Sequence, residues 1–255
     1  MIQVASARGA YVFFALACAI TWLLDVPMAL AIVQKAPPSP AAMLLAGLGA
    51  WGPTLAALLI AVRRRELREV FGRWRTHPIW IAVGLVTMPA LHLPATLIEV
   101  ALGGEPARWF YPPVQPEHVA ALVMFSLGEE FGWRGFAYPR LAERHGPVLG
   151  SILLGAVWGI WHLGMWFTPE GPPTIAALAI GIAEMAAGSL VFAWVFERGN
   201  RSMAVAFALH ASAHLDNTFR APETETRLRV LRFLVLTLAA AFAARSLAAS
   251  ARRKG

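Results

Sequence analysis

Charged side chains are scarce in this sequence of 255 residues: 15% are Asp, Glu, Lys or Arg, against about 25% in an ordinary soluble domain. Hydrophobic residues make up 58%, where roughly 45–50% is usual. So few charges cannot cover the surface of a soluble domain of this size, which excludes that class of protein. The bilayer is therefore the expected solvent of the chain.

Three further absences narrow the class. The one cysteine, Cys18, lies within an apolar run, so an intrachain disulfide and a cysteine-based zinc site are excluded. The apolar runs lack the alternating pattern of barrel strands, which disfavours an outer-membrane barrel. The N-terminal run has no small-residue cleavage site and is too long for a secretory signal peptide, so we expect an uncleaved first span.

Eight apolar segments are candidates to cross the bilayer, since a spanning helix needs about 20 residues. They cover residues 10–33, 41–62, 78–102, 119–138, 147–167, 174–196, 203–219 and 228–248. The sequence therefore predicts an all-α fold, a polytopic membrane bundle of about eight transmembrane helices. Residues 1–255 are expected to form a single integral membrane domain.

The basic residues predict the orientation of this bundle. They lie in short clusters between apolar runs, which indicates membrane topology and no nucleic-acid partner, despite a net charge of +7. If the N-terminus is cytoplasmic, 16 of the 22 lysines and arginines fall on the cytoplasmic side, including six arginines in the loop at 63–75. The positive-inside rule then places both termini in the cytoplasm. The alanine- and arginine-rich composition favours the bacterial inner membrane.

Several ionisable residues fall inside the predicted spans, where they are costly and become functional candidates. For Asp25, Glu99 and Glu184, a simple polar contact between helices is as good an explanation as a functional role. His92 lies between two prolines and fits a hydrogen bond to a carbonyl freed by a kink. The remaining residues form a set on three segments: Glu129, Glu130, Arg134, His162, His210 and His214.

The fourth segment contains two adjacent acids in LGEEFGWRG. On a helix, Glu130 and Arg134 share a face and can form a charge-assisted pair. Glu129 is rotated by about 100° from Glu130 and is left to point elsewhere. A structural ion pair with Arg134 needs only one acid, so the presence of a second acid, Glu129, inside a membrane span needs a separate explanation.

The histidines show the same helical spacing. Trp158 and His162 are four residues apart, as are His210 and His214. At 1.5 Å per residue, Glu129 and these histidines lie roughly 11 to 22 Å from the cytoplasmic ends of their segments. They therefore fit one buried polar cavity, in which glutamate takes a proton from water and histidine orients the water or stabilises an oxyanion.

These motifs resemble the CAAX prenyl protease and bacteriocin-processing (CPBP) family of intramembrane proteases, also called the Abi family. The resemblance covers residues 120–217, the motif-bearing core, and rests on EEFGWRG, on Trp158 with His162, and on the histidine motif after WVFERGNRSMAVAFALHA. It implies an eight-helix bundle that hydrolyses peptide bonds of a membrane protein or peptide.

The resemblance also implies roles for single residues. Glu129 would be the general base, His162 would hold the water, and His210 would contribute to the oxyanion hole. Glu130 and Arg134 would be structural or would position the substrate. Trp158 would support the catalytic residues. The family usually has Asn at the position of His214, so His214 and Asn217, one turn later, are candidates to substitute for it.

Two questions stay open at the level of sequence. Glu129, His162, His210 and His214 would also make a zinc set, because His-x-x-x-His is a known ligand spacing. We favour water activation without a metal cofactor, since it needs Glu129 and His162 alone. The alternatives to a protease are a catalytically silent membrane partner, such as an immunity protein, and a proton-coupled transporter.

Overall fold

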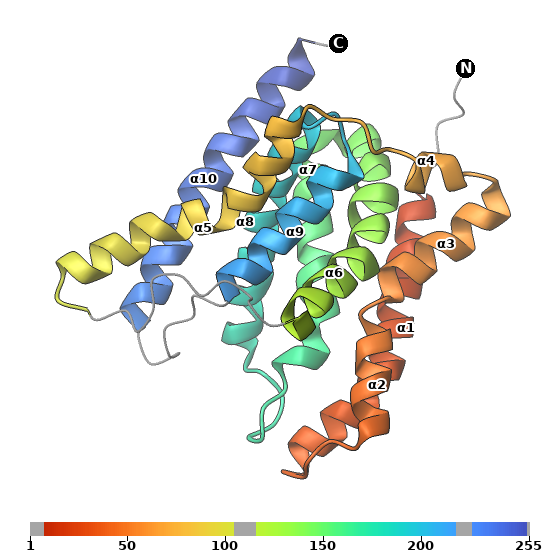
Figure 1. The fold of residues 1–255 in the computed structure, drawn as a ribbon, viewed down its shortest axis with the longest axis vertical. Helices are drawn as coiled ribbons and strands as arrows, with labels where there is room; N and C mark the ends of the chain where they lie inside the picture. The colour runs from red at the N-terminus through yellow and green to blue at the C-terminus, as the bar shows by residue number, and fades with distance from the viewer. Residues whose placement is uncertain (1–7, 105–115, 218–225, 254–255) are drawn as a thin grey trace. The chain divides into compact units, whose positions relative to one another are not determined.

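The computed structural model describes residues 8–104, 116–217 and 226–253. Within these ranges the chain forms helices joined by turns, and the one β-type pairing is an isolated bridge between Thr168 and Gly171. Figure 1 shows the helices in chain order. The predicted all-α fold is confirmed.

Five helices of the described ranges are long and apolar enough to cross a membrane, and a helix pair bent by 50° is a sixth candidate. The five are Gly9–Val33, Pro78–Ala101, Val119–Trp166, Ile175–Arg198 and Arg227–Arg252, and the pair is Pro40–Gly49 with Gly52–Arg64. A polytopic helical membrane bundle is therefore confirmed. The cytoplasmic placement of both termini stays a prediction.

The count of five or six differs from the predicted eight for two reasons. The predicted segments 119–138 and 147–167 lie in one stretch of 48 residues, Val119–Trp166, which Gly146 interrupts with a φ of 78° and a ψ of 160°, so the stretch holds two helices. Of the predicted segment 203–219, the described residues form α9 (Met203–Asn217), whose 15 residues rise about 22 Å, and residues 218–219 lie outside the described ranges. Hydropathy locates apolar runs, but it does not report where a helix bends or ends.

The chain divides into two compact units, Met1–Arg73 with Leu127–Ser189, and Trp74–Ser126 with Leu190–Gly255. Helices α6 (Pro116–Glu130) and α8 (Ile175–Arg198) each contribute residues to both units. The expectation of a single membrane domain, with its motif-bearing core at residues 120–217, stays a prediction.

The first unit is built around α1 (Arg8–Val33), which packs on α2 (Pro40–Gly49), α3 (Gly52–Arg64) and α7 (Tyr138–Trp161). Ser39 caps α2, because its hydroxyl accepts a hydrogen bond from Ala42 N at 3.1 Å and Pro40 occupies the first helical turn. After the bend, α3 ends at Arg65, which takes the left-handed conformation at φ 59°. The short α4 (Leu67–Phe71) follows.

The second unit contains α5 (Pro78–Ala101), which lies beside α9 and α10 (Thr226–Arg252) (Figure 1). Gly84 permits the close crossing of α5 and α9, because a Cβ there would come within 2.9 Å of the Ala208 methyl group. Glu99 of α5, almost fully buried, forms a bidentate ion pair with Arg227 of α10. The interhelical polar contact that the sequence suggested for Glu99 is confirmed.

Candidate active site

The two adjacent acids lie where α6 passes the bend between α2 and α3, in the first unit. A Cβ at Gly128 would come within 2.8 Å of the Ala50 carbonyl oxygen, and one at Gly132 within 2.6 Å of the Pro53 backbone. The Thr54 hydroxyl donates to the Leu127 carbonyl at 2.8 Å. The Gly-x-x-x-Gly spacing around the two acids thus lets two backbones approach closely, as small residues do between membrane helices.

Directly after Glu130 the helix widens into a π-helix, η1 (Phe131–Ala137). The spacing of Glu130 and Arg134 predicts a regular helix through this segment, and the π-helix corrects that prediction. The i→i+5 bonding of π-helices is rare and is frequent at functional sites. The C-terminal end of η1 is held by Arg140, which donates to the Phe136 carbonyl at 2.7 Å and pairs with Glu66 at 2.5 Å.

Glu130 and Arg134 form the predicted ion pair, with 2.8 Å between Oε1 and Nη1. Both side chains are buried, at 0% and 2% exposed. The Arg134 guanidinium also lies over the Trp158 ring, 4.6 Å from its centroid. Of the two adjacent acids, Glu130 is therefore paired with a buried cation, the Arg134 guanidinium.

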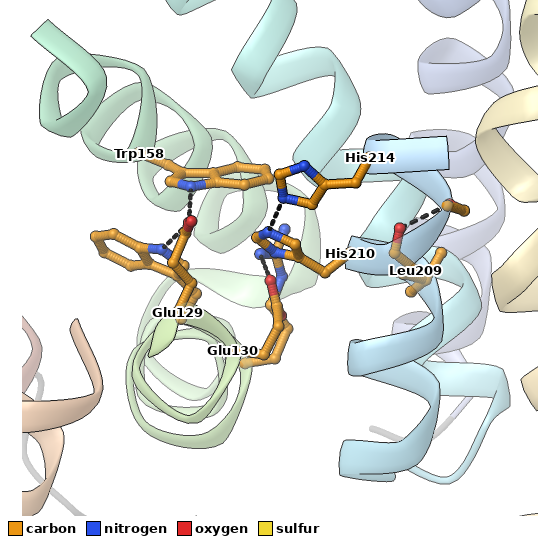
Figure 2. A network of polar contacts seen from close by, with 9 residues as sticks. Glu129, Glu130, Trp158, Leu209, His210 and His214 are labelled. Atoms are coloured by element: carbon orange, nitrogen blue, oxygen red, sulfur yellow. Dashed lines mark hydrogen bonds and ion pairs between the residues drawn. The ribbon is translucent and has the colours of Figure 1, made fainter. Parts of the chain in front are cut away.

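Glu129 has different partners, as Figure 2 shows. Its Oε2 accepts hydrogen bonds from the indole nitrogens of Trp133 at 3.1 Å and Trp158 at 2.8 Å. The side chain is 4% exposed. Two neutral donors thus orient this carboxylate, while Arg134 pairs with its neighbour. Trp133 was missed by the sequence analysis, although its position four residues after Glu129 was an available signal.

Trp158 reaches Glu129 from α7, which packs tightly on α8. A Cβ at Gly155 would come within 2.5 Å of the Ala186 Cα atom, and one at Gly159 within 2.9 Å of the Ile182 Cα atom. This is a second Gly-x-x-x-Gly spacing, and it surrounds Trp158. The contact that fits the supporting role predicted for Trp158 is its hydrogen bond to Glu129, the candidate general base.

His162 follows the last residue of α7 and begins the short 3₁₀ helix η2 (His162–Trp166). Its Nδ1 lies 2.7 Å from the Trp158 carbonyl oxygen. Because a carbonyl can only accept, Nδ1 carries the hydrogen, and a neutral His162 has its lone pair on Nε2. Trp158 therefore touches both candidates of this unit, through its indole to Glu129 and through its carbonyl to His162.

The other two histidines lie on α9 in the second unit. The Nε2 atoms of His210 and His214 are 3.1 Å apart (Figure 2), and the His214 ring stacks on Phe125 with centroids 5.5 Å apart. One Nε2 must donate and the other accept, so the pair carries one positive charge at most. Asn217 is the last residue of α9, and its side chain lies outside the described residues.

The ligand geometry bears on the zinc alternative. Among the residues that the structure describes, no group of three or more His, Cys, Asp or Glu side chains is arranged to hold a metal ion. The candidate donor atoms Glu129 Oε2 and His162 Nδ1 take part in the hydrogen bonds given above. Metal-free hydrolysis stays a prediction, which removal of metal ions from the purified protein tests.

These features define a polytopic membrane protein with a buried carboxylate and imidazoles. A family model, type II CAAX prenyl endopeptidase Rce1-like, matches residues 115–215. CAAX prenyl protease 2 of Methanococcus maripaludis is 24% identical over 173 residues, which is 63% of this chain. The match covers 64% of the length of that relative. Both comparisons bear out the resemblance that the motifs indicate, because over these residues the chain is similar to CAAX prenyl proteases.

Proposed function

We propose that this chain is an intramembrane endopeptidase that hydrolyses peptide bonds of a membrane-associated protein or peptide, in the bacterial inner membrane. The observation that carries the proposal is that two adjacent buried acids have different kinds of partner. Glu130 pairs with Arg134, whereas Glu129 is oriented by two indoles. A carboxylate held in this way keeps its capacity to accept a proton, which is what a general base needs.

In the proposed reaction, Glu129 takes a proton from a water molecule whose oxygen attacks the scissile carbonyl carbon. A carbon–oxygen bond forms and the carbonyl oxygen becomes an oxyanion. When the tetrahedral intermediate collapses, the carbon–nitrogen bond breaks and Glu129 returns the proton to the leaving amine. His162 orients the water through Nε2, since its Nδ1 hydrogen is directed at the Trp158 carbonyl.

Stabilisation of the oxyanion is assigned to His210, with His214 in the position where the family usually has Asn. Asn donates a neutral amide hydrogen bond. The hydrogen-bonded histidine pair can donate from a ring nitrogen and can also carry one positive charge, which favours a developing oxyanion. This assignment is supported by the order of the motifs and by the hydrogen bond within the pair.

The substrate must present an extended segment, because a helix keeps its carbonyls in its own hydrogen bonds. A prenylated C-terminal cysteine motif is suggested by the name of the relative, while peptide pheromones and bacteriocin leaders fit the bacterial composition. Comparison of the membrane proteomes of cells that carry the wild type or Glu129→Gln identifies the substrate, because an uncleaved precursor accumulates in the variant.

The direct test is hydrolysis of a quenched-fluorescence peptide ending in a prenylated cysteine motif, alongside an unprenylated peptide of the same sequence. Glu129→Gln retains an acceptor oxygen for the indoles but cannot take the proton, so we expect the rate to fall by about 10² to 10⁴. The control is Glu143→Gln, at an exposed glutamate of α7, which should hydrolyse at the wild-type rate. Wild-type hydrolysis by a folded Glu129→Gln variant would refute the proposal and favour the silent partner.

The transporter alternative needs titrating acids along the spans. Glu99 is an acid within a predicted span that could serve such a path, but it is held in the bidentate ion pair with Arg227. A structural role for Glu99 therefore weakens this alternative.

A further inference from the structure

The segment that carries His162 has little stability of its own. His162 begins a 3₁₀ helix of five residues, and short 3₁₀ helices have poor hydrogen-bond geometry. The carbonyls of Trp158, Gly159 and Ile160 at the end of α7 share one backbone donor, the His162 N–H. The Trp158 carbonyl holds one ring nitrogen of His162, and tertiary contacts must hold the segment that carries the ring.

One turn of α1 supplies such contacts through Trp161, the last residue of α7. The Trp22 indole nitrogen donates to the Trp161 carbonyl oxygen at 3.1 Å. The Trp161 indole nitrogen donates to the Thr21 hydroxyl at 2.8 Å, and that hydroxyl donates to the Gly49 carbonyl at 2.7 Å. The backbone and the side chain of Trp161 are thus both bonded to α1, and the chain of bonds continues to the end of α2.

Trp161 in turn contacts the candidate catalytic groups. Its ring meets the His162 ring edge to face, with centroids 4.7 Å apart. On the other side it meets the Trp133 ring, 5.9 Å away, and Trp133 donates to Glu129. Trp161 and Thr21 are each 3% exposed, so their hydrogen bonds are shielded from water.

The next turn of α1 reaches η2 itself. A Cβ at Gly164 would come within 3.1 Å of Asp25 Oδ2, and one at Gly49 within 2.7 Å of Asp25 Oδ1. The Asp25 carboxylate therefore lies between the last residue of α2 and the middle of η2, where Gly49 and Gly164 leave room for it. Thr21, Trp22 and Asp25 together present one stretch of α1 to the segment that follows α7.

We propose that Thr21 and Trp22 are positioning residues for hydrolysis: through Trp161 they hold the His162 ring in the orientation that directs the attacking water. This inference rests on the proposed function. Neither residue touches the reacting atoms. Removal of either bond leaves the substrate contacts in place and lets the His162 segment move, so it lowers kcat and leaves KM unchanged.

The test uses Thr21→Val, which keeps the shape and removes the hydroxyl, and Trp22→Phe, which keeps a ring and removes the donor. We expect each to lower kcat about tenfold, the effect of one hydrogen bond of ordinary strength. Thr21→Ser restores the hydroxyl and should recover the wild-type kcat. Thr237→Val is the matched control, because the exposed Thr237 hydroxyl donates to Phe233 of its own helix at 2.7 Å.

A second readout does not depend on activity. The rate at which diethyl pyrocarbonate modifies His162, followed by mass spectrometry in the Glu129→Gln background, should rise about tenfold in Thr21→Val. An unchanged modification rate together with wild-type kcat in Thr21→Val and Trp22→Phe would overturn the positioning role while leaving the proposed function intact. If Glu129→Gln itself stays active, the proposed function fails, and the modification rate still decides whether α1 positions His162.

Discussion

Replacement of Glu130 by glutamine tests whether the second acid is structural. Glu130 and Arg134 are almost completely buried, and their charged atoms are 2.8 Å apart. Removal of one partner of a buried ion pair costs about 3–5 kcal/mol, because the other charge stays buried without compensation. In Glu130→Gln the amide oxygen can still accept from Arg134, and the Glu129 carboxylate also attracts this guanidinium. We therefore expect the lower end of the range, about 3 kcal/mol.

Thermal unfolding of the purified protein in detergent, followed by circular dichroism, measures this loss. By the scaling for domains of 150–250 residues, 3 kcal/mol corresponds to a fall in Tm of about 6–12 °C. The matched control is Glu197→Gln, because Glu197 and Arg201 form a pair with the same i,i+4 spacing at 2.7 Å but are 18% and 40% exposed. An exposed pair contributes at most about 1 kcal/mol, so the control should shift Tm by about 4 °C or less.

A double variant completes the experiment. Glu130→Leu with Arg134→Met replaces both charges by apolar side chains, which is often neutral for a buried pair. We expect it to be more stable than Glu130→Gln alone. Equal Tm shifts for Glu130→Gln and Glu197→Gln would refute the claim that burial of the Glu130 pair determines its importance.

Two further predictions follow from the packing and from the donor atoms. Gly132→Ala places a methyl group 2.6 Å from the Pro53 backbone and should destabilise the protein by about 1–3 kcal/mol. The control, Gly188→Ala, has no atom within 4 Å of the added methyl group and should be neutral or stabilising by up to about 1 kcal/mol. Chemical denaturation of both variants measures the difference in the free energy of unfolding. Hydrolysis should continue after dialysis against a chelator, and loss of activity that Zn²⁺ restores would assign a metal mechanism instead.

Local spacing accounts for the parts of the site that sequence reasoning predicted correctly. Residues four apart on a helix are neighbours whatever the fold, so the contact of Glu130 with Arg134 could be read from the sequence, and so could that of His210 with His214. The same rule would have found Trp133 beside Glu129. The π-helix after Glu130 could not be predicted, because its wider turn depends on packing against neighbouring helices.

The sequence by itself determined the solvent, the helical class and the residues that lie inside spans at a cost, because composition and apolar run length reflect transfer from water to lipid directly. The tertiary structure decided what holds those residues. Trp158 is 29 residues from the Glu129 that it orients, and Thr21 is 140 residues from Trp161. Gly49 and Gly52, on either side of the bend between α2 and α3, leave room for Thr21, and hydropathy does not specify which helices meet.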